Sequence, residues 1–247
     1  MKEYYSFNKK LNKKLSKKTM KIVILAGGKG SRLSEFTKLV PKPMVRVKGL
    51  PIIVRIINHY LKFGFKEFII ATGYKSKIIE NYFKKNFLNL DIKIKYTGKS
   101  TMTGGRLKTL EKYLKGNTFM VTYGDGISNV NLRKLLKFHK QNRYIVTLTA
   151  VRPPARFGGI KLLGKKVKYF KEKSKLDAGW INGGFFVMED EIFKYIKNKK
   201  TVLEQYPLEK LSTLGKLGAF KHTGFWQCVD TLRDKELLEE AIRRKKI

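Results

Sequence analysis

The sequence predicts an α/β fold: a doubly wound, mostly parallel, Rossmann-like sheet with a small added β/α region. Short apolar runs, each long enough for one buried strand, alternate with longer segments of helical periodicity. Such alternation implies right-handed βαβ crossovers, which build parallel sheets with helices on both faces. The length of 247 residues and the hydrophobic content of 42% suit one full core and argue against global disorder.

The first half of the chain supplies most of the expected sheet. Its first apolar run, residues 22–25, is too short for a buried helix and fits one buried strand. Pro51 can open a helix and Gly64 can end it, so we expect a helix between them. The same reasoning predicts strands over 67–71, 92–96, 118–123 and 144–151, and helices over 75–86, 105–115 and 131–140.

From about residue 152 the pattern changes. Two strand-like stretches, 156–163 and 166–172, flank Gly164-Lys165 and predict a β-hairpin. Beyond them we expect strands over 181–188 and 217–222, and helices over 189–197, 203–214 and 231–245. There is no internal repeat, so we expect residues 20–247 to form a single domain with two parts, 20–151 and 152–247.

Residues 1–19 are rich in lysine, and we expect them to form a flexible basic extension. Met20 stands where the compact domain begins, so the extension is either a tether to a partner or a sign that Met20 is the true start. It lacks the apolar core of a secretory signal, and no apolar run approaches the ~20 residues that span a membrane. The single cysteine, Cys228, excludes an intramolecular disulfide and suits a reducing cytoplasm. We therefore expect a cytoplasmic protein without a membrane span.

The charge is strongly basic, with 55 Lys+Arg against 19 Asp+Glu and a formal net charge of +36. Such a balance suits nucleic acid or an anionic membrane surface as a partner. The lysines, however, are scattered through every segment apart from a group in 9–18, and no nucleic-acid-binding motif is present. We therefore interpret them as solvated surface residues, some of them recruited to an anionic substrate, and expect no specific nucleic-acid partner.

A glycine-rich loop, AGGKGSR over residues 26–32, follows the first strand directly. Glycines let the backbone approach a ligand closely, and the exposed N–H groups of such a loop suit phosphate oxygens. Arg32 adds a planar donor fork, and Lys42 adds a second cation held between two prolines. The alternative is a tight turn without a ligand, but the two cations favour a phosphate site.

Two aspartates are candidate metal ligands. Asp125 follows a predicted strand between two glycines, at the edge where open α/β sheets bind ligands. Mg²⁺ needs one or two carboxylates plus phosphate oxygens and water, and Asp230 is a second candidate. On spacing alone, Asp230 is better explained as the N-cap of the last helix. The three histidines, His59, His139 and His222, lack the spacing of a zinc site.

The stretch LAGGKGSRL followed by PKP resembles the signature of the sugar-phosphate nucleotidylyltransferases, with Ser31 in place of the usual threonine. Five further segments resemble the branch of this family that acts on CTP and glucose 1-phosphate: STMTGGRL, TYGDG, FKEK, WINGGFF and GFWQCVDTLRD. The resemblance extends over about residues 20–240. It departs from the family pattern at Ser174, which replaces the proline of Glu-Lys-Pro.

The resemblance implies transfer of a cytidylyl group from CTP to glucose 1-phosphate by in-line attack, giving CDP-glucose and pyrophosphate. It also implies a homo-oligomer, a role in making nucleotide sugars for surface polysaccharide such as O-antigen, and Mg²⁺ held by Asp125 and Asp230. In this reading residues 20–151 form the nucleotide-binding part and 152–247 the sugar-phosphate-binding part. The catalytic residues would be Arg32, Lys42, Asp125 and Lys173. The nucleotide would contact Leu25, Ala26, Gly27, Gly28, Lys29, Gly30, Ser31, Arg32, Lys42, Thr101, Arg106 and Gly124. The sugar phosphate would contact Gly158, Glu172, Lys173, Asn182, Gly183 and Trp226.

Several of these residues have plainer explanations. Lys173 resembles the many solvated lysines, Asn182 could mark a β-bulge, and Arg106 could be a surface residue. At the level of function, the alternatives are the same chemistry with UTP, dTTP or a heptose phosphate, or a basic binding protein that has lost catalysis. The two aspartates together with Lys42 and Lys173 argue against lost catalysis.

Overall fold

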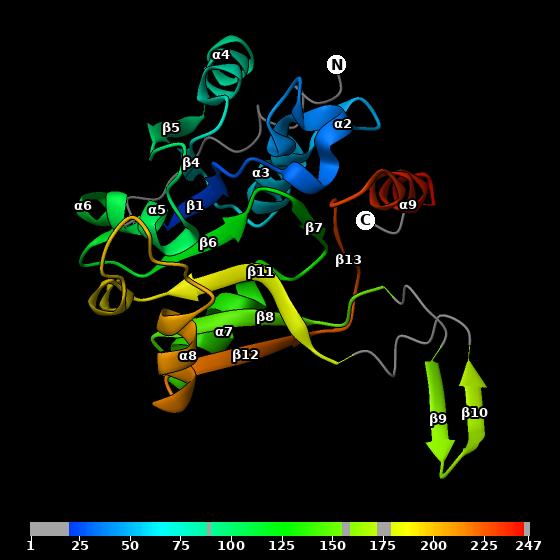
Figure 1. Cartoon of the computed structure of the whole chain (residues 1–247). Coiled ribbons are helices and arrows are strands. Elements are labelled where there is room, and N and C mark those ends of the chain that lie inside the picture. Colours follow the sequence, from blue (N-terminus) through cyan, green and yellow to red (C-terminus); the bar gives the residue numbers. More distant parts are fainter. Residues whose placement is uncertain (1–19, 88–89, 155–158, 172–178, 245–247) are drawn as a thin grey trace.

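The computed structural model describes residues 20–87, 90–154, 159–171 and 179–244. A seven-stranded sheet runs through the middle of the molecule (Figure 1). Its order is β12 (Leu217–His222), β8 (Val146–Val151), β11 (Ile181–Met188), β6 (Phe119–Tyr123), β1 (Lys21–Ala26), β4 (Glu67–Thr72) and β5 (Asp91–Tyr96). β11 is antiparallel to both of its neighbours, and the other neighbouring pairs are parallel. The predicted mostly parallel α/β sheet is therefore confirmed.

Strand β1 lies inside the sheet, between β4 and β6. Both faces of β1 are covered, which explains its continuous apolar run. Because side chains alternate along a strand, Ile22 and Ile24 enter one core and Val23 and Leu25 enter the other.

Helices cover both faces of the sheet. The core that contains Ile22 is closed by α3 (Ile52–Lys62), α4 (Ser76–Asn86), α7 (Leu132–Asn142) and α9 (Leu232–Arg243). The core that contains Val23 is closed by α5 (Thr103–Thr109), α6 (Glu111–Leu114), the 3₁₀ helix η4 (Asp190–Tyr195) and α8 (Tyr206–Thr213). The predicted alternation of strands and helices thus buries one apolar core on each side of the sheet.

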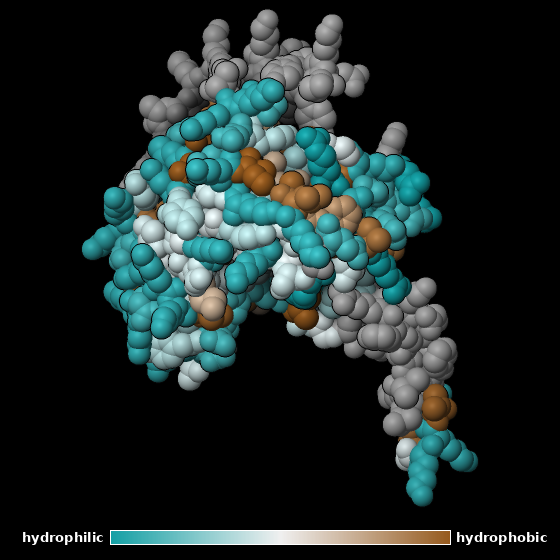
Figure 2. Space-filling model, turned by 45° about the horizontal axis from the view of Figure 1, so that its top comes forward, coloured by the Kyte–Doolittle hydropathy of each residue, from teal (hydrophilic) through white to brown (hydrophobic). Residues whose placement is uncertain are grey.

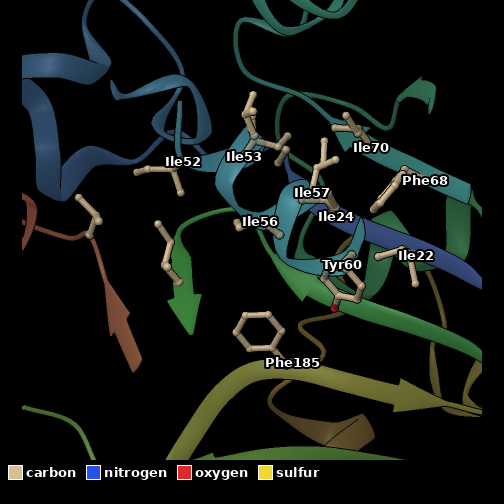
Figure 3. Packing of buried hydrophobic residues seen from close by; sticks show 14 of the residues in the cluster. Ile22, Ile24, Ile52, Ile53, Ile56, Ile57, Tyr60, Phe68, Ile70 and Phe185 are labelled. Carbon is tan, nitrogen blue, oxygen red and sulfur yellow. The ribbon is translucent and has the colours of Figure 1, made fainter. Parts of the chain in front are cut away.

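Helix α3 shows why the first core forms here. Its isoleucines recur at helical spacing, so one face of the helix is apolar. Figure 3 shows this face over β1 and β4, with Phe185 of β11 beneath it. The packed residues include Ile52, Ile53, Ile56, Ile57, Tyr60, Phe68 and Ile70.

Short elements complete the fold. They are the 3₁₀ helices η2 (Ser31–Leu33) and η3 (Lys42–Met44), helix α2 (Ser34–Thr37), the pair β2 (Arg46–Val47) and β3 (Leu50–Pro51), and the pair β7 (Gly126–Ser128) and β13 (Trp226–Cys228). The predicted hairpin is β9 (Gly159–Leu163) with β10 (Lys166–Lys171), and it stands away from the sheet (Figure 1). Residues 156–158 and 172 of that prediction lie outside the described residues.

Three sequence predictions were imprecise. The helix expected over 105–115 is two helices, because the backbone at Leu110 turns out of helical geometry at ψ 0°. The helix expected over 189–197 is the 3₁₀ helix η4, and the one expected over 203–214 begins only at Tyr206. The pairs β2–β3 and β7–β13 were not predicted, because strands of two or three residues are too short to show a period.

Hydrophilic residues cover most of the face in Figure 2, and apolar residues form a band across its upper middle and a few separate spots. No helix in the described part of the chain is long and apolar enough to cross a membrane.

Candidate active site

A cavity of about 330 Å³ lies at the carboxyl ends of β1 and β6. Ligands of open α/β sheets bind at this edge. All predicted nucleotide-binding and metal-binding residues except Lys29 line the cavity, together with Pro43, Met102, Thr103 and Tyr123. A second hollow of about 520 Å³, lined among others by Phe63 and Arg133, shares no lining residue with it. The structure therefore brings the predicted nucleotide residues together in one place.

Contacts within the protein require glycine at two positions of the glycine loop. A Cβ atom at Gly27 would lie 2.1 Å from Nη1 of Arg106, and Gly30 has a positive φ of 65°. A Cβ atom at Gly28 would meet no atom within 4 Å. Gly28 is therefore the glycine at which the backbone is open to a ligand.

Arg106 is not a surface residue, which corrects that alternative: it is 4% exposed. Its Nη2 donates to the carbonyl of Gly27 at 2.9 Å. Its Nη1 donates to the carbonyls of Thr72 and Gly98, at 3.1 and 2.9 Å, and to Oγ1 of Thr97 at 2.6 Å. Burial lowers the pKa of this guanidinium. The side chain thus ties the glycine loop to the ends of β4 and β5.

The glycines after Thr103 serve a contact within the protein. A Cβ atom at Gly105 would lie 2.2 Å from the carbonyl oxygen of Lys199, and one at Gly104 would lie 2.9 Å from that of Thr201. The N–H of Gly105 donates to the Thr201 carbonyl at 3.0 Å. The TGG sequence therefore lets the loop before α8 pack directly against the start of α5.

The two candidate carboxylates share one cation. Nζ of Lys42 donates to Oδ2 of Asp125 and to Oδ1 of Asp230, both at 2.6 Å. Nη1 of Arg32 lies 2.9 Å from Oδ2 of Asp230. Asp230 reaches this place because β13 pairs with β7 and the N–H of Val229 donates to the Asp125 carbonyl at 3.1 Å. Two cations and two anions thus meet at one end of the cavity.

Asp230 is not the N-cap of the last helix, so that prediction is wrong. Thr231 is the N-cap, and it forms a capping box with Asp234. Oδ2 of Asp234 also accepts from the backbone N–H of Asp230 at 3.1 Å. The capping-box residue Asp234 therefore holds the backbone of Asp230, while the carboxylate of Asp230 faces Lys42.

Burial and charge act against each other at this cluster. Burial alone would lower the pKa of Lys42, but the carboxylates of Asp125 and Asp230 raise it above 10.5. Burial would raise the pKa of Asp230, but Lys42 and Arg32 hold it below 3.8. Burial and the nearby carboxylates raise the pKa of Cys228 to about 12. Lys42 and Asp230 are therefore both charged near neutral pH, and the Cys228 thiol stays protonated.

The described sugar-side candidates lie next to the cavity. Nδ2 of Asn182 donates to the Tyr123 hydroxyl at 3.1 Å, and Nε1 of Trp226 donates to the Gly183 carbonyl at 2.8 Å. Asn182 also stands where the β11–β8 register shifts, as the β-bulge alternative expected. None of Asn182, Gly183 and Trp226 lines the 330 Å³ cavity, but Tyr123 does. Gly158, Glu172 and Lys173 lie outside the described residues.

Comparison with known proteins identifies the family. A nucleotidyl transferase family model matches residues 21–227. The chain belongs to this family.

Curated relatives of this nucleotidyltransferase include glucose-1-phosphate cytidylyltransferases. The glucose-1-phosphate cytidylyltransferase of Salmonella typhimurium is 43% identical over 243 residues, covering 89% of this chain and 95% of the relative. The probable glucose-1-phosphate cytidylyltransferase of Bacillus subtilis is 38% identical, covering 89% and 94%. A solved structure of a putative glucose-1-phosphate thymidylyltransferase from Bacillus anthracis superposes with a TM-score of 0.71 at 21% identity, covering 91% and 96%. That structure supports the fold.

Enzymes of the nucleotidyl transferase family generally use Mg²⁺, and the donor set here fits that ion. Both carboxylate oxygens lie 2.6 Å from the same nitrogen, so they are at most twice that distance apart. In the described part of the chain no group of three or more metal-ligating side chains occurs. Two carboxylates suffice for Mg²⁺, since it usually keeps water and phosphate oxygens as its other ligands.

Sequence reasoning missed four residues of this nucleotidyltransferase that form hydrogen bonds around the site. Thr103, Tyr123 and Glu204 form hydrogen bonds beside the cavity, and Asp234 bonds the Asp230 backbone. The Thr-x-x-Asp spacing of a capping box was a usable signal for Asp234. No pattern in the sequence points to Glu204.

Proposed function

We propose that this nucleotidyltransferase transfers a cytidylyl group from CTP to α-D-glucose 1-phosphate, giving CDP-glucose and pyrophosphate. The observation that carries the proposal is the match to the Salmonella cytidylyltransferase over nearly the full length of both chains. The cavity supports the reaction class, because it joins a glycine loop, buried cations and two carboxylates.

The triphosphate is proposed to lie along residues 27–32. The open backbone at Gly28 and the exposed side chain of Arg32 face this stretch of the cavity. Arg106 holds the loop from beneath through the Gly27 carbonyl. Backbone N–H groups and an arginine fork are the donors that suit phosphate oxygens.

The reaction does not require a covalent bond between the protein and its substrates. A phosphate oxygen of glucose 1-phosphate attacks the α-phosphorus of CTP, a new P–O bond forms, and the bond to the β-phosphate oxygen breaks to release pyrophosphate. Both reactants are anions, so catalysis consists of positioning and charge stabilisation. We propose Arg32, Lys42 and Lys173 as the cations that bring the reactants together.

We propose that Asp125 and Asp230 hold Mg²⁺. When bound, the ion would supply positive charge at the phosphate oxygens. Lys42, which bonds both carboxylates in the structure, is placed to donate to a phosphate oxygen from the same end of the cavity. Asp234 keeps Asp230 in place through the backbone bond.

We also propose that the chain forms a homo-oligomer. The β9–β10 hairpin extends from the body (Figure 1), and Leu163 and Val167 on it are 65% and 56% exposed. Light scattering after size-exclusion chromatography measures this directly, and a monomer contradicts it. The division at residue 151, the role of residues 1–19, the part played in surface-polysaccharide synthesis and the cytoplasmic location stay predictions.

The deciding experiment measures pyrophosphate release with glucose 1-phosphate and Mg²⁺, offering CTP, UTP, dTTP, ATP and GTP separately. We expect release with CTP and loss of release in EDTA. Release with another nucleotide keeps the reaction class and corrects the base. Silence with all five, followed by release when a heptose 1-phosphate replaces the glucose phosphate, corrects the sugar. Silence throughout, in a folded sample, favours a binding protein that has lost catalysis.

A further inference from the structure

Four polar side chains form a continuous hydrogen-bonded series beside the cavity, which we call the Glu204 series. Its members are Thr103, Glu204, Tyr123 and Asn182. They come from the start of α5, the loop before α8, the end of β6 and the start of β11. The series therefore connects the helix that carries Arg106 with the strand that carries Asn182.

Glu204 is the central member, and its two carboxylate oxygens have different partners. Oε2 accepts from the Thr103 hydroxyl at 2.6 Å, and Oε1 accepts from the Tyr123 hydroxyl. The loop around Glu204 is itself fixed on α5, because the Leu203 N–H donates to Oγ1 of Thr103 at 2.9 Å and the Met102 N–H donates to the Lys199 carbonyl at 3.0 Å. In Figure 1 this loop rises from η4 to α5 and returns to α8.

The bond to Glu204 sets the direction of the Tyr123 hydroxyl. Since the hydroxyl donates its one proton to Glu204, its lone pairs are left to accept from Nδ2 of Asn182 at 3.1 Å. Removing the carboxylate would let the hydroxyl turn and point its proton at the Asn182 amide.

The sugar side is fixed in the same way. Oδ1 of Asn182 accepts from the Gly184 N–H at 2.9 Å, so both ends of the amide are bonded and its orientation is set. Gly184 has a φ of 77°, and a Cβ atom there would lie 2.4 Å from the Tyr123 ring. The neighbouring carbonyl of Gly183 holds Trp226. Tyr123 thus contacts the backbone turn that presents the sugar-side candidates.

We propose that Glu204 is a positioning residue that couples the nucleotide side of the site to its sugar side. One carboxylate oxygen holds Thr103 and the start of α5, and the other holds Asn182 through Tyr123. This inference rests on the proposed function for its assignment of the two sides. It makes a specific claim: breaking each link separately affects the two substrates separately.

The test compares the KM values for CTP and for glucose 1-phosphate in single variants. Tyr123→Phe keeps the ring against Gly184 and removes the link to Asn182, so it raises mainly the KM for glucose 1-phosphate. Thr103→Val removes the link to α5 and raises mainly the KM for CTP. Glu204→Ala raises both, each on the order of tenfold, the usual scale for losing a hydrogen bond to a charged group.

Conservative and control variants separate positioning from folding. Glu204→Gln keeps one acceptor oxygen and restores part of the loss. Glu209→Gln and Tyr206→Phe make the same chemical changes at exposed positions of α8 and leave both KM values unchanged. Melting temperatures of all variants report any loss of folded protein.

The outcomes are distinct. Unchanged KM values in Glu204→Ala, with kcat falling only as the folded fraction falls, overturn the inference and assign Glu204 a structural role. Equal rises of both KM values in Tyr123→Phe and in Thr103→Val also overturn it. A wild type that is active with another nucleotide or sugar phosphate overturns the proposed function alone, and the KM comparison is then made with that pair.

Discussion

Two buried cations reach the same cavity, and their partners differ. Lys42 is 8% exposed and Arg106 is 4% exposed. The ammonium of Lys42 bonds the carboxylates of Asp125 and Asp230. The guanidinium of Arg106 bonds three backbone carbonyls and one hydroxyl. At one side of the site, the Lys42 corner, a cation is therefore paired with carboxylates. At the other side, the Arg106 corner, a cation is bonded only to uncharged dipoles.

The difference determines what each corner attracts. At the Lys42 corner, Arg32 and Lys42 balance the two aspartates, so the cluster carries little net charge. At the Arg106 corner, no ion pair to Arg106 occurs among the described residues, and the carbonyls do not cancel its charge. We infer that the uncancelled positive charge of Arg106 attracts the triphosphate towards the glycine loop. At the Lys42 corner, Mg²⁺ would take the place of the Lys42 ammonium between the two carboxylates.

The largest expected effect comes from the carboxylates. Asp125→Asn removes one of two candidate metal ligands and leaves Lys42 paired with Asp230. We expect pyrophosphate release to fall by about 10²–10³-fold, the scale of losing one electrostatic group in an active site. Asp91→Asn, at an exposed position of β5, is the matched control and keeps wild-type activity. Unchanged release in Asp125→Asn would remove Asp125 from the metal site.

The Arg106 corner is tested by Arg106→Lys. Lysine keeps the charge but lacks the planar fork that reaches Gly27, Thr72 and Gly98 together. We expect the KM for CTP to rise on the order of tenfold and the melting temperature to fall, since buried carbonyls lose a donor. Arg233→Lys, exposed on α9, is the control. A wild-type KM for CTP in Arg106→Lys would show that the fork does not shape the loop.

A smaller and purely steric effect is expected at the glycine loop. Gly27→Ala places a methyl group against the Arg106 guanidinium, so we expect it to lower the free energy of unfolding by about 1–3 kcal/mol. Gly28→Ala meets no atom within 4 Å and should leave the melting temperature unchanged. Thermal unfolding of the two variants measures the difference. Equal melting temperatures would mean that Arg106 moves aside at no cost.

The smallest effect concerns Cys228, which lies beside the carboxylates with Sγ 3.7 Å from Oδ2 of Asp230. Its pKa is raised to about 12, so at pH 8 very little thiolate is present to react. In EDTA we expect iodoacetamide to modify the folded protein far more slowly than the urea-unfolded chain. Asp230→Asn removes one negative neighbour and should speed the modification a few-fold. Equal rates in folded and unfolded protein would contradict the raised pKa.

Many of the helices and strands could be predicted from local sequence patterns. The buried run 22–25, the helix ended by Gly64 and the strand before Asp125 were predictable, because period and punctuation are local signals. Most of the cavity-lining residues were also placed by their motifs. The partners of those residues were not. Arg106 bonds carbonyls from three separate segments, and Glu204 contacts Thr103 and Tyr123 from a distant loop.

The misplaced predictions have the same origin. On spacing alone, Asp230 was assigned to a helix cap because the true cap, Thr231, differs from it by one position. Only the fold shows which of the two side chains accepts from the Asp234 N–H. The antiparallel insertion of β11 between β6 and β8 brings Asn182 to Tyr123. Such long-range pairing leaves no periodic trace in the chain itself.

The return of β13 to β7 also has a consequence for biosynthesis. A chain emerging from the ribosome can form β1, β4 and β6 well before Asp230 is made. Until β13 pairs with β7 and Leu238 of α9 enters the core, Lys42 has only Asp125 of its two carboxylate partners. The charged centre therefore receives its last member only after every strand of the seven-stranded sheet has been made.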